Sequence, residues 1–260
     1  MIKAKKSFGQ NFLKDKNIIQ KIVNSLDIST DDLIIEIGPG QGALTKELKN
    51  KGCKIVAFEI DERMHEILDE IEDENTKVIY KDFLTVDLET ELKDIKYNKL
   101  FVIANLPYYI TTPIIERLIN SPYKIDDMVV MVQNEVADRF CAKVGTREYG
   151  LMTILLNVKY NLKKLFIVKN TCFNPIPKVD SAVVHLSLKE SNSNICNVDK
   201  FQNYLKMSFS HKRKTLKNNL SKDLWEKTLE ILVKKDININ VRAEDLSLED
   251  YIDICNYIYK

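Results

Sequence analysis

Three glycines gather in the segment EIGPGQG, which spans residues 36–42. A glycine-rich turn between a strand and a helix lets backbone N–H groups and the helix N-terminus approach a ligand closely. Because Gly38, Gly40 and Ala43 satisfy the loose dinucleotide pattern, the loop fits a nicotinamide dinucleotide or S-adenosylmethionine equally well. Glu59 stands 21 positions after Gly38 at the end of the next apolar run, where a carboxylate accepts hydrogen bonds from ribose hydroxyls in either class. The alternative interpretation of Glu59 is an acidic side chain at a strand end that faces solvent.

The segment Asn105-Leu106-Pro107-Tyr108 directly follows the apolar run LFVIA. It suits a planar base with an exocyclic amine, which is a poor nucleophile because its lone pair is delocalised into the ring. The Asn105 side-chain oxygen and the Leu106 carbonyl can hold such an amine pyramidal and aimed at a sulfonium methyl, while Tyr108 stacks on the base. The alternative is an ordinary strand exit, in which Pro107 ends the pairing and Tyr108 packs in the core.

Strand-like and helix-like patterns alternate around these motifs. The runs typical of strands occupy residues 33–37, 54–60, 77–80, 100–105, 128–133 and 182–188. Helical patterns lie at residues 16–26 and 43–50, and Thr112 is expected to cap another helix with Pro113 in its first turn. This order predicts an α/β domain with a largely parallel sheet over residues 1–188.

The strand pattern stops beyond residue 188. Residues 189–199 are polar and typical of a linker, and residues 200–260 are helical in character. In the last helix we expect Ser247 as the cap, because apolar side chains follow it at the spacing of one helical face. A small all-helical domain is therefore expected over residues 200–260.

Charge is segregated although the net charge is only +1. Residues 1–21 and 200–222 are strongly basic, and the segment 59–94 between them is strongly acidic. We call Lys212, Arg213, Lys214 and Lys217 the basic cluster; it follows three aromatic side chains, Phe201, Tyr204 and Phe209. Such cations contact phosphates, so the pattern favours a polyanion such as RNA. We expect the aromatic rings themselves to be buried in the small domain.

Several classes of protein are disfavoured by composition. The five cysteines are far apart and show no Cys-x-x-Cys spacing, which argues against a disulfide framework or a zinc knuckle. His65 and His185 lack the spacing of a metal or nucleophilic site, so no metal is expected. The basic start has no apolar leader and the longest apolar runs are strand-sized. We expect a cytoplasmic protein with no membrane partner, and nothing requires more than a monomer.

The joint order of several motifs resembles that of the ribosomal RNA adenine dimethyltransferases. The motifs are FGQNFL (8–13), EIGPGQGALT, FEID (58–61), KDF (81–83), NLPY (105–108) and FNPIPKVDSAVV (173–184). The resemblance spans essentially the whole chain, and PKVDSAVV with KRKTLKNNL (212–220) makes it most similar to the KsgA/RsmA family that acts on the small ribosomal subunit. It implies a Rossmann-like class I methyltransferase sheet with S-adenosylmethionine across the carboxyl ends of its strands.

The resemblance also assigns roles to cofactor-binding residues. Asn11 and Leu13 are expected to cover the methionine end of S-adenosylmethionine, with Gln10 and Ile60 as neighbours. Gly38 is expected to contact the cofactor through its backbone and Glu59 to hold the ribose. Asp82 is expected to accept from the adenine amino group, unless it only caps a turn. Asn105 is expected to stand between cofactor and substrate.

Substrate contacts follow from the same resemblance. Phe173 and Tyr108 are expected to sandwich a flipped adenine, although Phe173 can instead be a core anchor. Lys178 is expected near the RNA backbone, and the basic cluster is expected to dock on the ribosome. One departure is Tyr109, where members commonly have Asn, and this puts local contacts in doubt.

The expected activity is dimethylation of the N6 amines of two adjacent adenosines in 16S ribosomal RNA, with a role in small-subunit biogenesis. Three alternatives stay open. An Erm-type methylase of 23S RNA shares NxPY and much of the fold. A non-catalytic RNA-binding assembly or transcription factor can keep the fold, and an NAD dehydrogenase fits the glycine loop but leaves NLPY and the basic cluster unexplained.

Overall fold

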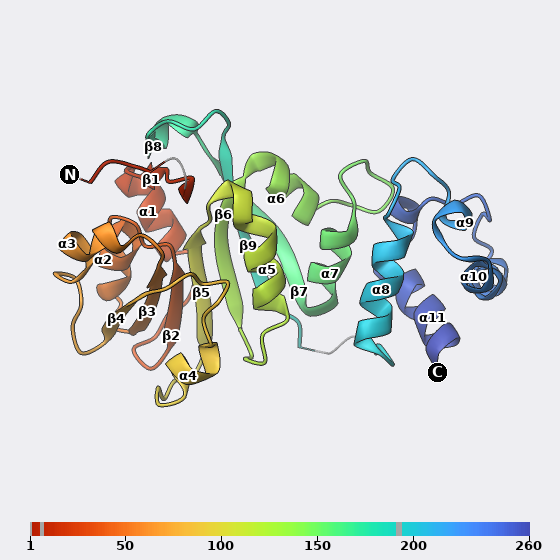
Figure 1. The fold of residues 1–260 in the computed structure, drawn as a ribbon, viewed down its shortest axis with the longest axis horizontal. Coiled ribbons are helices and arrows are strands. Elements are labelled where there is room, and N and C mark those ends of the chain that lie inside the picture. Colours follow the sequence, from red (N-terminus) through yellow and green to blue (C-terminus); the bar gives the residue numbers. More distant parts are fainter. Residues whose placement is uncertain (1, 6–7, 191–193) are drawn as a thin grey trace. The chain divides into compact units, whose positions relative to one another are not determined.

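The computed structural model describes residues 2–5, 8–190 and 194–260. It divides into two compact units (Figure 1). The first contains residues up to 137 together with 163–188, and the second contains residues 138–162 and 189–260. Residues 138–162 thus group with the C-terminal helices although they lie well before residue 188, where the change in sequence pattern suggested a boundary. Contacts between distant segments decide this grouping, and a change of composition along the sequence does not reveal such contacts.

The first unit is built on a mostly parallel sheet. In the described part of the chain it has seven strands in the order β4-β3-β2-β5-β6-β9-β7. The strands that pair in parallel are β2 (Leu33–Ile37), β3 (Lys54–Glu59), β4 (Thr76–Tyr80), β5 (Leu100–Asn105) and β6 (Asp127–Gln133). Strand β9 (Ser181–Leu188) runs antiparallel beside β6. The strands expected from the sequence are confirmed to within one residue at each end.

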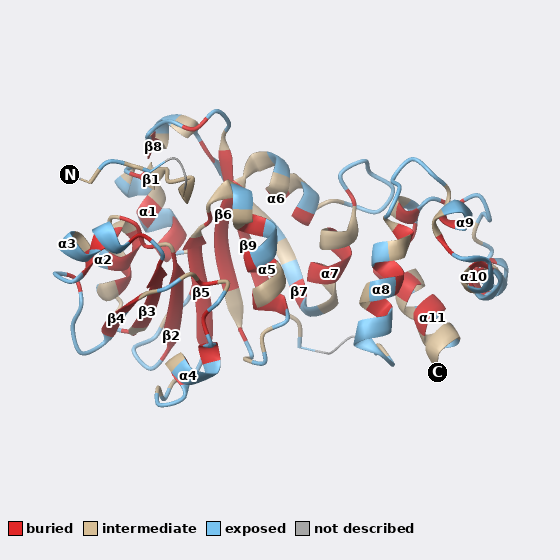
Figure 2. Cartoon of the chain, viewed as in Figure 1, coloured by how far each residue is buried: buried red, intermediate tan, exposed pale blue. Residues whose placement is uncertain are grey.

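Strand β7 (Tyr160–Val168), at the edge of the sheet, is the one strand of this sheet, as far as the structure describes it, that the sequence patterns missed. Its middle carries Lys163 and Lys164, and most of its residues are at least partly exposed. An edge strand keeps polar side chains toward solvent, so it lacks the continuous apolar run that marks a central strand. By contrast, the central strands β2 and β5 are buried almost throughout (Figure 2).

The longer helices of the first unit include α1 (Lys16–Val23), α2 (Ala43–Lys49) and α5 (Thr111–Ile119). Helices α1 and α2 pack their apolar sides into one core cluster with residues of the sheet. Asp15 caps α1 by accepting from the backbone N–H groups of Asn17 and Ile18, and α1 ends before the expected residue 26.

The expected cap of α5 is wrong. This helix begins at Thr111, and no side chain caps its first turn. The hydroxyl of Thr111 instead donates to the carbonyl of Pro107 at 3.1 Å, which ties the helix to the segment after β5. The expected buried side of α5 is confirmed and consists of Ile114, Ile115, Leu118 and Ile119.

A two-stranded ladder joins the N-terminal segment to a loop far along the chain. Strand β1 (Phe12–Leu13) pairs antiparallel with β8 (Phe173–Asn174), so Leu13 lies opposite Phe173. Both side chains belong to the core cluster beneath α1 and α2. The pairing positions residues 8–13 beside the carboxyl edge of the sheet.

The second unit is helical around a core of its own. Its main helices are α7 (Leu151–Lys159), α8 (Val198–Ser208), α9 (Leu216–Asn219), α10 (Lys222–Lys234) and α11 (Leu248–Tyr259). Ser247 caps α11 in a reciprocal pair with Asp250, as expected. Tyr204 and Tyr251 are fully buried there with their hydroxyls bonded to Thr228 and to the Ala243 carbonyl. Within the described ranges, no helix has the length and apolar character needed to cross a membrane.

Candidate active site

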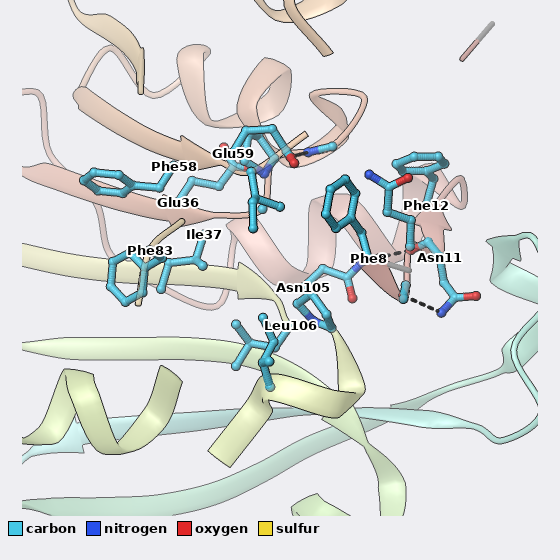
Figure 3. A pocket seen from close by; sticks show the side chains of 18 of the residues that line it. Phe8, Asn11, Phe12, Glu36, Ile37, Phe58, Glu59, Phe83, Asn105 and Leu106 are labelled. Carbon is cyan, nitrogen blue, oxygen red and sulfur yellow. Dashed lines mark hydrogen bonds between the residues drawn. The ribbon is translucent and has the colours of Figure 1, made fainter. Parts of the chain in front are cut away.

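A pocket opens where the carboxyl ends of β2, β3 and β5 meet (Figure 3). Its lining includes the glycine loop after β2, Glu59 and Ile60 at the end of β3, and Asp82 and Phe83 after β4. The segment after β5 and residues 8–13 add further walls. In an open α/β sheet, ligands bind at this edge because loops there are free to vary while the strands hold them in place.

The glycine loop is fixed to the neighbouring strand through its backbone. Gly38 N donates to the Phe58 carbonyl, and Gly40 N donates to Glu59 Oε2, each at 2.9 Å. Gly40 has φ of +57°, and a Cβ on it would lie 3.0 Å from the Phe12 ring. Only glycine fits this position without strain, so the loop can lie close to a bound ligand.

Glu59 is held by two backbone groups in an almost fully buried position. It is 4% exposed, Oε2 accepts from Gly40 N, and Oε1 accepts from Asp61 N at 2.9 Å. Burial raises the pKa of Glu59, and the two backbone hydrogen bonds oppose that rise. Each carboxylate oxygen keeps a lone pair for another donor, so the side chain can accept from a diol at the pocket wall.

Glu36 is a second buried carboxyl of the pocket, and sequence patterns gave it no role. It is 1% exposed, and no described residue gives its Oε2 a hydrogen bond. Burial raises the pKa of Glu36 to about 8, with nearby Glu59 adding to the rise and Thr45 opposing it. Burial and the neighbouring Glu59 therefore both favour the neutral form of Glu36.

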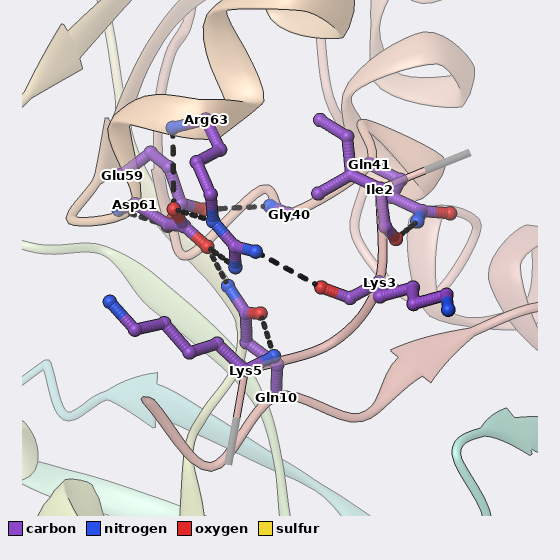
Figure 4. A network of polar contacts seen from close by, with 9 residues as sticks. All are labelled: Ile2, Lys3, Lys5, Gln10, Gly40, Gln41, Glu59, Asp61 and Arg63. Atoms are coloured by element: carbon purple, nitrogen blue, oxygen red, sulfur yellow. Dashed lines mark hydrogen bonds and ion pairs between the residues drawn. The ribbon is translucent and has the colours of Figure 1, made fainter. Parts of the chain in front are cut away.

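A polar network fastens the N-terminal segment beside the glycine loop (Figure 4). Gln10 Nε2 donates to Asp61 Oδ2 at 2.8 Å, and Gln10 Oε1 accepts from Lys5 N at 2.8 Å. Arg63 donates to both Asp61 oxygens and to the Lys3 carbonyl. The Arg63 hydrogen bond is the largest cause that lowers the pKa of Asp61 to about 2. The same Asp61 donates its backbone N–H to Glu59, so the network joins the pocket wall to the chain start.

Asp82 caps a turn and also lies at the pocket. Its Oδ1 accepts from Leu84 N at 2.9 Å, which is the turn cap, and its side chain also lines the pocket. Among the described residues, Oδ2 has no hydrogen-bond partner. One oxygen of Asp82 thus remains available to a ligand amine.

The Asn105 amide is oriented by the N-terminal segment. Its Nδ2 donates to the Asn11 carbonyl at 3.1 Å, which leaves Oδ1 as the acceptor at the pocket (Figure 3). Leu106 as a whole residue is 1% exposed, and its backbone N–H donates to the Met131 carbonyl at 3.1 Å. No described residue donates to the Leu106 carbonyl. Within the described ranges, both acceptors that the sequence suggested are therefore without a donor; the Asn105 side chain is held through Nδ2 and the Leu106 backbone through its N–H.

The two aromatic residues expected to sandwich a base differ sharply. Tyr108 lines the pocket, and its hydroxyl forms a 2.8 Å hydrogen bond with the Ser181 hydroxyl. Burial is the main cause of the raised pKa of Tyr108, which keeps the phenol neutral. Phe173 is only 1% exposed and packs in the core opposite Leu13. Its position fits the core-anchor alternative, because pairing with β1 turns the side chain into the apolar cluster and away from the pocket.

Lys178 and the basic cluster, the cationic residues expected to contact RNA, are all exposed. Lys178 lies in the loop after β8, in the first unit. The basic cluster lies in the second unit between α8 and α10, where Lys212 Nζ donates to the Arg147 carbonyl at 3.3 Å. Upstream of it, Phe201 and Tyr204 are buried as expected, whereas Phe209 is half-buried and packs on Tyr251.

Two further aromatic rings of the pocket, Phe8 and Phe12, received no role from the sequence. They belong to the FGQNFL motif, so the signal was present in the resemblance. Asn11 and Leu13 line the same pocket, as expected for residues of that motif, and so do Gln10 and Ile60.

Comparisons with known proteins agree over the whole chain. The family model described as ribosomal RNA adenine dimethylase matches residues 1–260. A relative from Streptococcus pyogenes serotype M3, named ribosomal RNA small subunit methyltransferase A, is 43% identical over 95% of this chain and 89% of its own length. The serotype M5 relative of the same name is 44% identical with the same coverage.

Solved structures give the same result for the fold. A dimethyladenosine transferase from Plasmodium falciparum superposes with a TM-score of 0.81 at 29% identity, covering 94% of this chain and 95% of that one. The 23S rRNA methyltransferase ErmE has a TM-score of 0.71 at 21% identity, covering 96% of this chain and all of that one. The mostly parallel sheet with its ligand edge is thus the Rossmann-like class I methyltransferase fold, as the sequence predicted.

Proposed function

The chain belongs to the ribosomal RNA adenine dimethylase family, and we propose that it dimethylates two adjacent adenosines of 16S ribosomal RNA with S-adenosylmethionine. The methyl groups go to the N6 amine of each adenosine, and the reaction belongs to small-subunit biogenesis in the cytoplasm. The name shared by the Streptococcus pyogenes relatives favours the small subunit over the large one. We propose that the protein acts as a monomer and uses no metal ion.

The donor set of the pocket fits S-adenosylmethionine, which supplies a methyl group on a positively charged sulfur when bound. Glu59 accepts from the ribose hydroxyls, and Asp82 Oδ2 accepts from the adenine amine. Gly38 contacts the cofactor through its backbone, and Asn11 and Leu13 cover the methionine end. The unpaired Oδ2 of half-buried Asp82 and the spare lone pairs of buried Glu59 support this arrangement, because both can accept from ligand donors.

One observation carries the proposed chemistry: the Asn105 amide is turned so that Oδ1 faces the pocket, because Asn11 holds its Nδ2. Oδ1 and the Leu106 carbonyl accept the two N–H bonds of the adenine amine, which favours a pyramidal nitrogen with a localised lone pair. Tyr108 stacks on the base and fixes its plane. These acceptors are set before the reaction, so little reorganisation is needed as charge develops on nitrogen.

The transfer itself needs no strong base. Bound S-adenosylmethionine would supply the methyl group to the nitrogen lone pair, with the electrons of the broken C–S bond staying on sulfur. The nitrogen carries a positive charge and then loses one proton to solvent. After the first transfer one N–H remains, so one of the two acceptors holds it while the pocket accommodates the methyl group beside the other.

Exposed cations supply the RNA contacts in this proposal. Lys178 meets phosphates near the pocket loop, and the basic cluster, Lys212, Arg213, Lys214 and Lys217, docks on the ribosomal RNA. Phosphate contacts position a protein without reading sequence, and RNA is selected largely by its shape and its splayed bases. Their exposure supports the assignment, since long cationic side chains reach the phosphate backbone from solvent.

Transfer of labelled methyl groups to purified, undermethylated ribosomal subunits tests the proposal. We expect dimethyladenosine in the small subunit alone after nucleoside analysis. Label in the large subunit would favour the Erm-type alternative. Absence of label in both subunits, together with binding of S-adenosylmethionine by calorimetry, would favour a non-catalytic RNA-binding factor.

A further inference from the structure

Tyr109 is an exposed aromatic residue at the rim of the pocket, and the proposed reaction gives it no role. Its side chain is 58% exposed, although its chain neighbours Tyr108 and Ile110 both line the pocket. These three residues form one short 3-10 turn between β5 and α5. A large aromatic ring is thus presented to solvent within one residue of the site where the target base is expected.

The ring of Tyr109 rests on the N-terminal segment. A Cβ placed on Gly9 would lie 3.1 Å from both Cδ1 and Cε1 of Tyr109, so the ring lies directly against the Gly9 backbone. Gly9 itself has φ of +59° and lines the same pocket. A tyrosine has few torsions, and this contact restricts them further, so little conformational entropy is lost when a partner binds.

The two aromatic rings that were expected to sandwich the target base are committed elsewhere. Tyr108 points to the pocket with its hydroxyl bonded to Ser181, and Phe173 is buried in the core. The described residues provide no hydrogen-bond partner for the Tyr109 hydroxyl, so packing alone holds its ring. Tyr109 therefore combines a fixed position with an accessible aromatic surface.

We infer that Tyr109 is a stacking platform for the base next to the target adenine. This inference rests on the proposed function, in which two adjacent adenosines enter the pocket in turn. While one base occupies the pocket beside Tyr108, its unstacked neighbour must lie within one nucleotide of the rim. A purine there loses its stacking partner in the RNA, and an aromatic ring restores that contact without reading sequence. Tyr109 thereby keeps the second adenosine at the entrance between transfers.

Three substitutions separate stacking from simple packing. Tyr109→Phe keeps the ring, Tyr109→Leu keeps apolar cover over Gly9 without an aromatic face, and Tyr109→Ala removes both. With undermethylated small subunits as substrate, we expect Tyr109→Phe to have the KM of the wild type. We expect Tyr109→Leu and Tyr109→Ala to raise KM for the subunit by about tenfold, which is the scale of one lost base-stacking contact. Cofactor affinity, measured by calorimetry, should be unchanged in all three.

The pattern of products is a readout that a structural role does not change. Mass analysis of the target RNA fragment should show accumulation of molecules with only one adenosine modified in the Leu and Ala variants. Tyr257→Ala, at a tyrosine of α11 that is 49% exposed, serves as the matched control and should give the wild-type pattern. If Tyr109→Leu shows the wild-type KM and the wild-type pattern of products, Tyr109 only covers Gly9 and the inference is overturned. If the wild type itself modifies no adenosine, the proposed function fails first.

Discussion

The pocket of the first unit and the basic cluster of the second hold their polar groups in opposite ways. Glu59 and Asn105 are each fixed by hydrogen bonds to backbone groups from distant parts of the chain. The basic cluster is exposed, and the contact of Lys212 is with a single carbonyl. Groups that are buried and fixed act through position, whereas exposed cations act through summed charge.

This difference predicts how each region responds to substitution. Removing one fixed acceptor destroys a geometry that no neighbour can replace. Removing one exposed cation leaves the field of the others nearly intact, because phosphate contacts are individually weak and collectively strong. Effects should therefore be large and local in the pocket, and smaller, shared and salt-dependent in the basic cluster.

The largest effect is expected for Asn105→Ala. The acceptor is proposed to act on the amine during transfer, so kcat should fall about 100- to 1,000-fold while cofactor affinity changes little. Single-turnover methyl transfer with calorimetry of S-adenosylmethionine measures the two separately. An equal loss of rate and cofactor affinity would contradict a role at the reacting nitrogen.

Glu59→Ala should come next. It removes the proposed ribose acceptor and leaves the N–H groups of Gly40 and Asp61 without their acceptor. Cofactor affinity should therefore fall roughly 10- to 100-fold, equivalent to about 1.4 to 2.8 kcal/mol. Calorimetric titration with S-adenosylhomocysteine measures this without turnover. Retention of wild-type affinity would remove Glu59 from the cofactor site.

Replacement of Lys212, Arg213 and Lys214 together by alanine should have a moderate effect on RNA. Binding to small subunits should weaken about tenfold near physiological salt, and the slope of log affinity against log salt should become shallower by about 2 to 3. Cofactor affinity should stay at the wild-type value. An unchanged salt slope would exclude the basic cluster from the interface.

The smallest effect concerns the pH dependence of stability at Glu36. The unfolded chain loses this proton near the usual pKa of 4.5, whereas the folded chain keeps it to about pH 8. The stability contributed by neutral Glu36 is therefore complete below pH 4.5 and lost as pH rises toward 8. The Tm of Glu36→Gln relative to that of the wild type should rise by several degrees between pH 5 and pH 8. A Tm difference that is independent of pH would refute this assignment.

Local sequence patterns were sufficient for the central strands and the glycine turn of the site, whereas the β1–β8 ladder that positions residues 8–13 was not among the expected elements. The central strands have continuous apolar runs because both of their faces are buried, and the glycines of residues 38–42 mark the turn at which the ligand edge begins. Edge strand β7 was missed because its lysines interrupt any such run. The cap of α5 was misplaced since its first turn has no side-chain cap, so the usual signal was absent.

The sequence by itself determined the fold class, the family and the motifs that converge at the carboxyl edge of the sheet, because these depend on residue type and spacing along the chain. Tertiary structure alone decided how the side chains are used. It turned Phe173 into the core, oriented the Asn105 amide through Asn11, and buried Glu36 with no partner for Oε2 among the residues that the structure describes. Asn11 and Asn105 are 94 positions apart. Contacts of this kind arise when distant segments pack together, and no local pattern encodes their geometry.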